Sequence, residues 1–290
     1  MSAIKFNNVS KSFSKTIAVN RNNLSVERGE IFGFLGPNGA GKTTSIRCLM
    51  DFIRPDVGTI EVLGMDSRRD SVTLKSKIGY LSAEHHLHND WTGKEHIQFV
   101  SQLRNLKSTT KNLSDKLVFD PTVKVKNLST GNRQKLAIIL AYLGEPELII
   151  MDEPTQGLDP ILQNQFYIIA EDYSKAGGTI FMSSHNLTEV ERLCQSVAII
   201  NKGKIVNEET LESLKAKSMH KITLSYKQPI SYPFGSLKNV SVVSKSSNGI
   251  VFKVSGSLDE ILHQISMLPI KDIEIVRANL DEIFMEYYND

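Results

Sequence analysis

The sequence predicts an α/β fold built on a parallel sheet, with a helical insertion and a small C-terminal α+β domain. Short apolar runs alternate with helical patterns through about residue 215, which is typical of α/β units around parallel strands. Between Trp91 and Gly144 the strand signal disappears and helical spacing replaces it. Beyond this region the pattern changes again, to short strands. We therefore predict a first domain over residues 1–217, with its helical subdomain at about 88–145, and a second domain over residues 218–290.

Each predicted element follows from its local pattern. The strands of the first domain are almost entirely apolar because parallel strands are covered on both faces. These strands are residues 31–35, 148–152, 179–183 and 197–201. Within the insertion, apolar residues recur at helical spacing over residues 96–106 and 132–144. The second domain is predicted to run β-β-β-α-β-α, over residues 221–227, 240–245, 249–254, 258–268, 270–276 and 280–288.

Composition and charge exclude several classes of protein. The chain has 290 residues, enough for a full hydrophobic core, and its net charge of +2 is spread without a basic tail, so no nucleic acid is expected as a partner. No apolar run approaches the roughly 18 to 20 residues that cross a bilayer, and the N-terminus lacks the layout of a signal peptide. These features predict a soluble, cytosolic chain. Cys48 and Cys194 lie in predicted helices without C-x-x-C spacing, so we expect both to be buried and reduced.

Residues 36–43, GPNGAGKT, match the phosphate-binding pattern G-x-x-x-x-G-K-[ST] completely. They follow a predicted strand and open a predicted helix, which is the setting that this motif requires. There, backbone N–H groups and the helix N-terminus form a cradle for a polyphosphate. Lys42 would contact the β- and γ-phosphates, and the Thr43 hydroxyl would ligate Mg²⁺. Gly39 and Gly41 keep side chains away from the phosphates.

A second chemical motif follows the predicted strand 148–152, which ends at Asp152 and is followed by Glu153. Both carboxylates then lie at the carboxyl edge of the sheet, where doubly wound folds bind ligands. Asp152 is expected to hold the Mg²⁺ shell, and Glu153 to polarise the water that attacks the γ-phosphate. His185 follows another strand at the same edge, within reach of the γ-phosphate. By itself, a histidine there is more often a structural hydrogen-bonder, so the pattern alone leaves its role open.

The segment LSTGNRQKL, residues 128–136, resembles the LSGGQ-type signature of ATP-binding cassette (ABC) ATPases. The phosphate loop, this signature, the double carboxylate, the GLD tripeptide at 157–159 and the histidine after a strand occur in the order found in that family. The resemblance covers about residues 4–215 and implies a P-loop NTPase core that binds and hydrolyses ATP with Mg²⁺. The C-terminal sequence NLDEIFMEYY is similar to an extension of cassette subunits that serve ABC-2 type exporters. It implies an ATPase subunit that powers export through separate transmembrane subunits.

Residue by residue, the resemblance implies one ATP site. Its phosphate-binding residues are Gly36, Pro37, Asn38, Gly39, Ala40, Gly41, Lys42, Thr43 and Thr44. Thr43 and Asp152 would hold magnesium. Catalysis would fall to Glu153, which activates water, and to His185, which contacts the γ-phosphate. Phe13 matches the aromatic residue that stacks on adenine, and it keeps the flat π face that stacking needs where Tyr is commoner. Packing of Phe13 beside a strand is the alternative.

The signature also implies a partner. Ser129 and Gly131 would lie at a helix N-terminus, a preformed anion site that in this family faces the ATP of another subunit. That subunit is a second copy of the chain or a paralogous cassette, and each ATP would join the phosphate loop of one chain to the signature of the other. Gly157, Leu158 and Asp159 match the loop across which two such sites sense one another. The resemblance places this dimer beneath transmembrane permease subunits, peripheral on the cytoplasmic face of the cell membrane.

The sequence departs from the family pattern at several positions. Aligning residues 78–84, IGYLSAE, with the usual IGYLPQ or IGYLPE places Ala83 where the Gln or Glu of the Q-loop is expected. Two hypotheses remain open: the adjacent Glu84 substitutes after a shift of the loop, or coupling is loose and activity is set elsewhere. Other departures are Thr130 for Gly, Asn132 for Gln and Gln156 for a small residue. Activity is expected to survive them because Glu153 and His185 are both present.

Histidines and one tryptophan follow Ala83. His85, His86 and His88 lack the supporting pattern of a zinc site, so a solvated loop is expected. Trp91 is expected either to pack in the groove that meets the transmembrane partner or to join the core of the insertion.

Two functions of other classes compete with transport. One is a soluble ABC protein that acts on ribosomes or DNA, but such proteins generally carry two cassettes or a long coiled-coil insertion, and neither pattern is present in the sequence. The other is a nucleotide-sensing regulatory subunit with little turnover, a reading that Ala83 keeps open.

Overall fold

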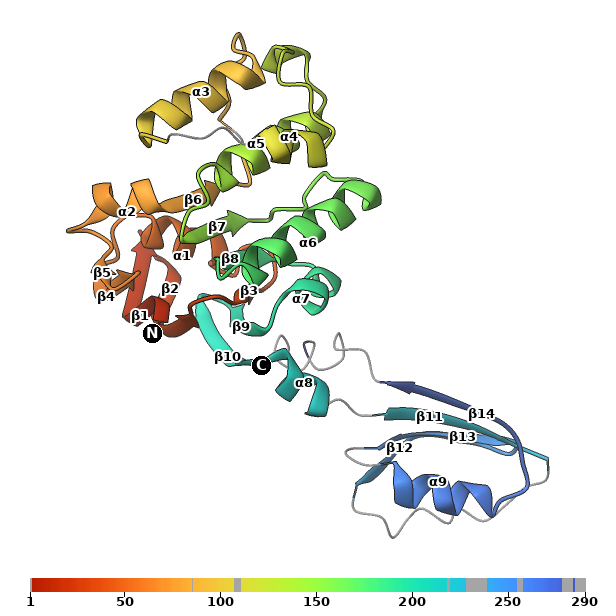
Figure 1. Cartoon of the computed structure of the whole chain (residues 1–290). Helices are drawn as coiled ribbons and strands as arrows, with labels where there is room; N and C mark the ends of the chain where they lie inside the picture. Colours follow the sequence, from red (N-terminus) through yellow and green to blue (C-terminus); the bar gives the residue numbers. More distant parts are fainter. Residues whose placement is uncertain are drawn as a thin grey trace. The chain divides into compact units, whose positions relative to one another are not determined.

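The computed structural model describes residues 2–84, 86–106, 111–217, 220–227, 239–254, 258–277 and 284 (Figure 1). The chain divides into two compact units, Met1–Glu209 and Thr210–Asp290. The sequence pattern set this boundary after residue 217, and the difference is the short helix α8, Leu211–Lys217, whose contacts assign it to the second unit.

A six-stranded sheet forms the centre of the first unit, in the order β10-β9-β3-β8-β7-β6. Its strands are β3 (Ile31–Leu35), β6 (Ile78–Leu81), β7 (Leu148–Asp152), β8 (Thr179–Ser184), β9 (Ser196–Asn201) and β10 (Lys204–Thr210). From β9 to β6 each strand is parallel to its neighbour. Every residue of β3, β7 and β8 is buried because both faces of the sheet are covered. The predicted α/β fold is confirmed.

One face of this sheet is covered by helix α1 (Lys42–Leu49), which also contacts a second, antiparallel sheet (Figure 1). The antiparallel sheet has the order β2-β1-β4-β5. Its strands are β1 (Ser2–Phe13), β2 (Thr16–Glu27), β4 (Val57–Val62) and β5 (Met65–Asp66). The sequence analysis did not predict this sheet. Several register shifts interrupt the pairing of β1 with β2, so the alternation of apolar and polar residues that marks a strand is irregular there.

Helices α6 (Pro160–Lys175) and α7 (Leu187–Leu193) pack against β8 and β3. Gly33 shows how closely α7 approaches the sheet, because a Cβ added there would lie 3.0 Å from side-chain atoms of Val190 and Cys194. Both cysteines are buried and free, and burial raises the pKa of the Cys48 thiol to about 11. Cys194 lies one residue beyond the end of α7 instead of inside the predicted helix.

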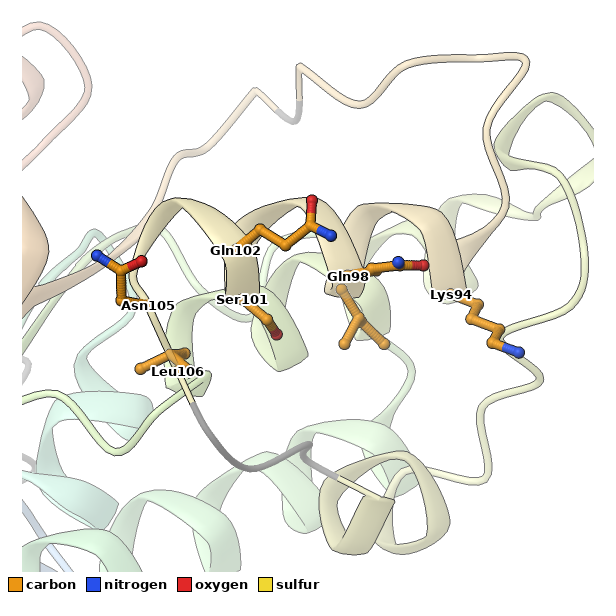
Figure 2. Close-up of a pocket in the computed structure, with 7 residues that line it drawn as sticks. Lys94, Gln98, Ser101, Gln102, Asn105 and Leu106 are labelled. Atoms are coloured by element: carbon orange, nitrogen blue, oxygen red, sulfur yellow. The ribbon is translucent and has the colours of Figure 1, made fainter.

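The insertion is helical, as predicted. It contains α3 (Gly93–Leu103), α4 (Lys111–Lys116), a short 3₁₀ helix (Val125–Asn127) and α5 (Thr130–Tyr142), while helix α2 (Ser71–Lys77) precedes β6. Helix α3 begins at a capping box in which Thr92 and Glu95 bond each other's backbone N–H groups. Trp91 packs inside the insertion, with its ring 5.3 Å from those of His96 and Phe99. A cavity of about 570 Å³ lies along α3, and Figure 2 shows Lys94, Ser101 and Leu106 among its lining.

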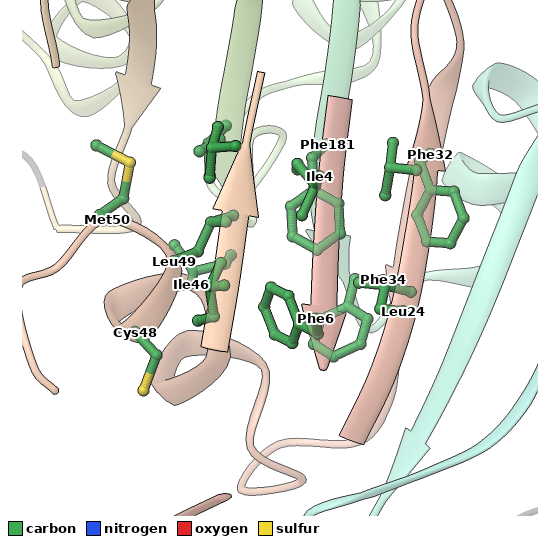
Figure 3. Packing of buried hydrophobic residues seen from close by; sticks show 14 of the residues in the cluster. Ile4, Phe6, Leu24, Phe32, Phe34, Ile46, Cys48, Leu49, Met50 and Phe181 are labelled. Atoms are coloured by element: carbon green, nitrogen blue, oxygen red, sulfur yellow. The ribbon is translucent and has the colours of Figure 1, made fainter. Parts of the chain in front are cut away.

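The main core fills the space between the two sheets (Figure 3). Phe6 of the antiparallel sheet and Ile46 of α1 meet the aromatic residues of the parallel sheet in this core. The ring of Phe181 lies 6.0 Å from that of Phe32 and 5.5 Å from that of Phe34, and all three side chains are at most 1% exposed. Aromatic pairs at these distances stabilise the core beyond the effect of their buried area.

The second unit contains an antiparallel sheet in the order β12-β13-β11-β14. Its strands are β11 (His220–Tyr226), β12 (Val240–Ser246), β13 (Gly249–Val254) and β14 (Ile270–Arg277). Helix α9 (Asp259–Ser266) contributes Ile261 and Ile265 to a core shared with Leu224 and Phe252. The described elements follow the predicted order. The last predicted helix and most of the NLDEIFMEYY segment lie outside the described residues.

Replacing Phe181 with Ala should lower the free energy of unfolding of the first unit by about 3–5 kcal/mol, since the cavity would open in the middle of the core. Trp91 is the single tryptophan of the chain and lies in this unit, so denaturant unfolding followed by its fluorescence reports the change. Val72→Ala, at a side chain that is 85% exposed, is the control and should shift stability by less than about 0.5 kcal/mol. A similarly small loss for Phe181→Ala would contradict this assignment of the core.

Candidate nucleotide-binding site

The phosphate loop connects the end of β3 to the start of α1, as its motif predicted. Gly41 precedes the helix with φ of 107°, a left-handed conformation that favours glycine, and no side chain caps the first turn. Among the described residues, no side chain accepts from the first-turn N–H groups, which lie at the positive end of the helix dipole. The glycines are also needed for space. A Cβ at Gly36 would lie 2.4 Å from the Ile200 carbonyl oxygen, and one at Gly41 would lie 2.3 Å from that of Ala18.

Lys42 folds back over the loop that precedes it. Its side chain is 6% exposed, and Nζ donates hydrogen bonds to the carbonyl oxygens of Gly36 at 2.7 Å and Pro37 at 3.3 Å. Nζ also lies 3.2 Å from Oε1 of Glu153. This last contact is a charge pairing and not a hydrogen bond, because Oε1 has no hydrogen-bond partner of good geometry among the described residues. The ammonium group is thus held where a polyphosphate in the cradle would meet it.

The two predicted carboxylates leave β7 in different environments. Asp152 is 2% exposed, and its Oδ1 accepts a hydrogen bond of 2.5 Å from the Ser183 hydroxyl. Glu153 adopts a φ of 52°, which is uncommon outside glycine and turns the chain sharply off the strand. Its N–H donates to Oγ and to the carbonyl oxygen of Ser183, at 3.1 and 3.2 Å. Ser183, near the end of β8, therefore holds the carboxylate of Asp152 and the backbone of Glu153.

His185 joins this group from the turn that follows β8. Its Nδ1 lies 2.7 Å from Oε2 of Glu153, and its side chain is 50% exposed. Nδ1 is the donor in this bond when Glu153 is ionised, since a carboxylate only accepts. The structure thus brings Lys42 and His185 together around the Glu153 carboxylate, and no described residue forms a hydrogen bond with the other ring nitrogen of His185.

The remaining predicted residues lie apart from this cluster or at its edge. Thr43 is exposed on the first turn of α1. Phe13 ends β1 with 48% of its surface exposed, so it is not a core residue, and the ammonium group of Lys11 lies 5.5 Å from its ring centre. Ser129 is the N-cap of α5, where its hydroxyl accepts from Asn132 N–H. Gly131 lies beside Leu162 of α6.

Sequence reasoning missed several polar residues that hold the site. Ser183 and Ser184 end β8, and Glu189 lies buried in the first turn of α7. The buried side chain of Gln134 on α5 donates to the carbonyl oxygen of Pro154, next to Glu153. A signal was present in the two adjacent serines, which are polar residues at the end of an otherwise apolar strand. The two serines belong to no known sequence motif, so the sequence alone does not identify them as site residues.

The fold and the site together define a P-loop protein that binds a nucleoside triphosphate. Residues 19–156 match the sequence profile of a family described as ABC transporter. The chain is 34% identical over 220 residues to the bacitracin transport ATP-binding protein BcrA of Enterococcus faecalis, covering 74% of this chain and 71% of BcrA. It is 37% identical over 205 residues to the ABC transporter ATP-binding protein NatA of Bacillus subtilis (strain 168), covering 68% and 83%.

A solved structure of an ATP-binding subunit of an ABC transporter matches with a TM-score of 0.70 and 25% identity, over 74% of this chain and 92% of that one. The chain therefore belongs to the family of ABC transporter ATP-binding proteins, and the resemblance found in its motifs is confirmed. Among the residues described, no helix is both long enough and apolar enough to span a bilayer.

Replacing Gly41 with Ala should weaken binding of MgATP by about 100-fold or more, measured by titration calorimetry, because the new Cβ would collide with the backbone at Ala18. Gly64→Ala is a matched control. Gly64 also has a positive φ, 80°, but it lies in the β4–β5 turn, and nothing lies within 4 Å of its added Cβ. Circular dichroism should show both variants folded. Equal binding by the two would contradict the close-packed cradle.

Proposed function

We propose that this chain is the ATP-hydrolysing subunit of an ABC exporter, working with Mg²⁺ as a cassette dimer beneath separate transmembrane subunits. Its membership of the family makes it an ATP-binding ATPase subunit. The observation that carries the hydrolytic part is the meeting of Lys42, Glu153 and His185 around one carboxylate. These groups supply a cation for phosphate, a base for water and a hydrogen-bond donor, which is the set that hydrolysis of a phosphoanhydride requires.

The contact between Lys42 and Glu153 suggests that triphosphate binding comes before Glu153 acts on water. The ammonium group of Lys42 and the carboxylate of Glu153 lie 3.2 Å apart, and because both side chains are largely buried each neutralises the other's charge. A triphosphate in the loop competes for the ammonium group, because its γ-phosphate carries more charge than one carboxylate. Oε1 of Glu153 is then released toward the space beyond the γ-phosphate, where it accepts a hydrogen bond from the attacking water. His185, already bonded to Oε2, keeps that carboxylate oriented.

The residues present fit a magnesium ion. Asp152 offers a carboxylate fixed by Ser183, and Thr43 offers a hydroxyl on the first turn of α1. Hard oxygen donors of this kind suit Mg²⁺, which binds with few protein ligands and completes its shell with phosphate oxygens and water. When bound, the ion neutralises charge on the β- and γ-phosphates.

The dimer is supported by the signature helix. The Ser129 hydroxyl accepts from the N–H of Asn132, and the other N–H groups of the first turn of this 13-residue helix would bind an anion; both Ser129 and Thr130 are exposed. In our proposal it binds the γ-phosphate held by a second copy of the chain or by a paralogous cassette. A neighbouring contact joins this element to the GLD loop, since Gly157 lies beside the Thr130 methyl group. The loss of phosphate from one site would then be transmitted to the other site through the loop of Gly157, Leu158 and Asp159.

Partners and location are inferred from the relatives. BcrA is named for bacitracin transport and NatA as an ABC transporter ATP-binding protein. We therefore place this chain on the cytoplasmic face of the cell membrane, where closure of the ATP-bound dimer would drive the permease subunits between two states. No nucleic acid takes part in this scheme.

Glu153→Gln should lower the rate of ATP hydrolysis by about 100-fold or more, because the amide cannot accept the proton of the attacking water. The same variant should accumulate as a dimer in the presence of MgATP, measured by size-exclusion chromatography with light scattering. Glu191→Ala, on α7, is the control and should hydrolyse at the wild-type rate. Undiminished hydrolysis by Glu153→Gln would overturn the proposed role of the carboxylate.

The position of Ala83 permits a second candidate, a regulatory subunit with little turnover. Glu84 beside it is exposed, and the Ser82 hydroxyl donates to the Glu84 carbonyl oxygen at 2.6 Å, which fixes the turn. If Glu84 replaces the missing Q-loop side chain, Glu84→Ala should lower hydrolysis at least about tenfold, whereas His86→Ala in the same exposed loop should not. Unchanged turnover in Glu84→Ala would remove the substitution hypothesis. A wild-type chain that binds MgATP without hydrolysing it would favour the regulatory function.

A further inference from the structure

Glu189 is a buried carboxylate behind the nucleotide site. It lies in the first turn of α7 and is 1% exposed. Burial raises the pKa of its carboxyl from the ordinary 4.5 to about 7, and the negative charge of Glu153 adds to the rise. A group this costly to bury is retained only when it makes specific contacts. The fold itself does not need a carboxylate at this position, since Val190 and Leu193 anchor α7 to the core.

The first contact of Glu189 is with the turn that carries His185. Its Oε2 accepts a hydrogen bond of 2.5 Å from the Ser184 hydroxyl. The same hydroxyl oxygen accepts from the Asn186 N–H at 2.9 Å, and the hydroxyl also lies 3.3 Å from the Asn186 carbonyl oxygen, so Ser184 joins Glu189 to the residue that follows His185. The Ser184 carbonyl oxygen in turn accepts from the N–H of Gly36, the first residue of the phosphate loop, at 3.2 Å.

The second contact is with the loop that carries Glu153. The Thr155 hydroxyl lies near enough to the Glu189 carboxylate to lower its pKa, partly opposing the effect of burial. Thr155 is 8% exposed and lies two residues after Glu153. Oε1 of Glu189 has no hydrogen bond of good geometry within the described residues, so Thr155 approaches the carboxylate without closing a second ideal bond. One side chain thus touches both loops whose ends meet at the His185–Glu153 bond.

We propose that Glu189 is a positioning residue for hydrolysis, which holds the His185 turn and the Glu153 loop in register through Ser184 and Thr155. The inference rests on the proposed function, because it concerns the same catalytic carboxylate. Glu189 does not touch the nucleotide cradle directly. Its loss should therefore affect the chemical step more than nucleotide binding. Misplacement of a catalytic group by about 1 Å is enough to cost about 100-fold in rate.

The charged and titratable neighbours of Glu189 set how this contact depends on pH. Glu153 and His185 face it from the site, Tyr167 from α6, and Cys194 from beyond the end of α7. Arg192 acts on Tyr167 from α7. A hydroxyl donates more strongly to a carboxylate than to a neutral carboxyl group. The bond from Ser184 should accordingly tighten as pH rises through about 7, where Glu189 ionises.

The test compares Glu189→Ala, Glu189→Gln and the control Glu191→Ala in the full chain, with turnover and MgATP binding measured for each. Glu189→Ala should lower kcat at least about tenfold while the dissociation constant of MgATP changes less than about threefold. Glu189→Gln should retain most of the activity, because its carbonyl oxygen still accepts from Ser184, but its kcat should lose any dependence on ionisation near pH 7. Equal kcat for wild type and Glu189→Ala would overturn the proposal.

A double-mutant cycle separates positioning from a general loss of packing. Ser184→Ala removes the hydroxyl and keeps the backbone carbonyl that Gly36 needs. If Glu189 acts through Ser184, the double variant should be no slower than the slower single variant, whereas multiplied effects would contradict the proposed route. A wild-type chain that fails to hydrolyse ATP would instead count against the proposed function, so the two failures are distinguishable.

Stability gives a readout that does not depend on activity. Because the pKa of Glu189 is raised in the folded state, the folded chain binds the proton more tightly than the unfolded chain. Its contribution to stability is present at low pH and declines as pH rises from about 4.5 to about 7. The Tm of Glu189→Gln relative to wild type should therefore be higher at about pH 8 than at about pH 5. A difference independent of pH would show that Glu189 is not the buried titrating group.

Discussion

The register of three parallel strands is the constraint on which the rest of this site depends. Leu35 pairs with Ser184, and Ser183 pairs with Asp152, so β3, β8 and β7 end side by side. Backbone hydrogen bonds fix that alignment within the buried sheet, where a slip would leave polar groups unpaired. The phosphate loop, the Glu153 turn and the His185 turn each begin within two residues of a strand end. Their chemistry therefore meets at one edge without long or flexible connections.

Charged and polar groups at this edge of the sheet contact one another. Lys42 pairs with Glu153, Glu153 with His185, and Asp152 with Ser183. Each pairing lowers the cost of removing charge from water. In the proposed function the same pairings also define the response to a triphosphate, because a phosphate group would compete for the cation that the Glu153 carboxylate holds. A single set of contacts thus serves both folding and the proposed chemistry.

Much of the fold could be predicted from the sequence, for identifiable reasons. Strands such as 31–35 and 148–152 are apolar throughout because they are buried on both faces, and that pattern is visible without a structure. The antiparallel sheet was not predicted, since register shifts break its alternation. The predicted boundary after residue 217 differs from the division of the structure after Glu209, because the sequence of the short helix α8 does not indicate which unit it packs against. The order of the strands in the sheet could not be predicted from local sequence patterns either.

By itself the sequence determined the local chemistry of this protein: the glycines of the phosphate loop, the two carboxylates after a strand, and the family to which these motifs belong. Each of these features depends on residues that are close together in the chain, so a sequence motif is enough to identify it. Tertiary structure alone decided that β8 lies between β3 and β7. That order brings Ser183, Ser184 and Glu189 behind Glu153 and His185, and no local pattern indicates it, because contacts across a sheet join residues far apart in the chain.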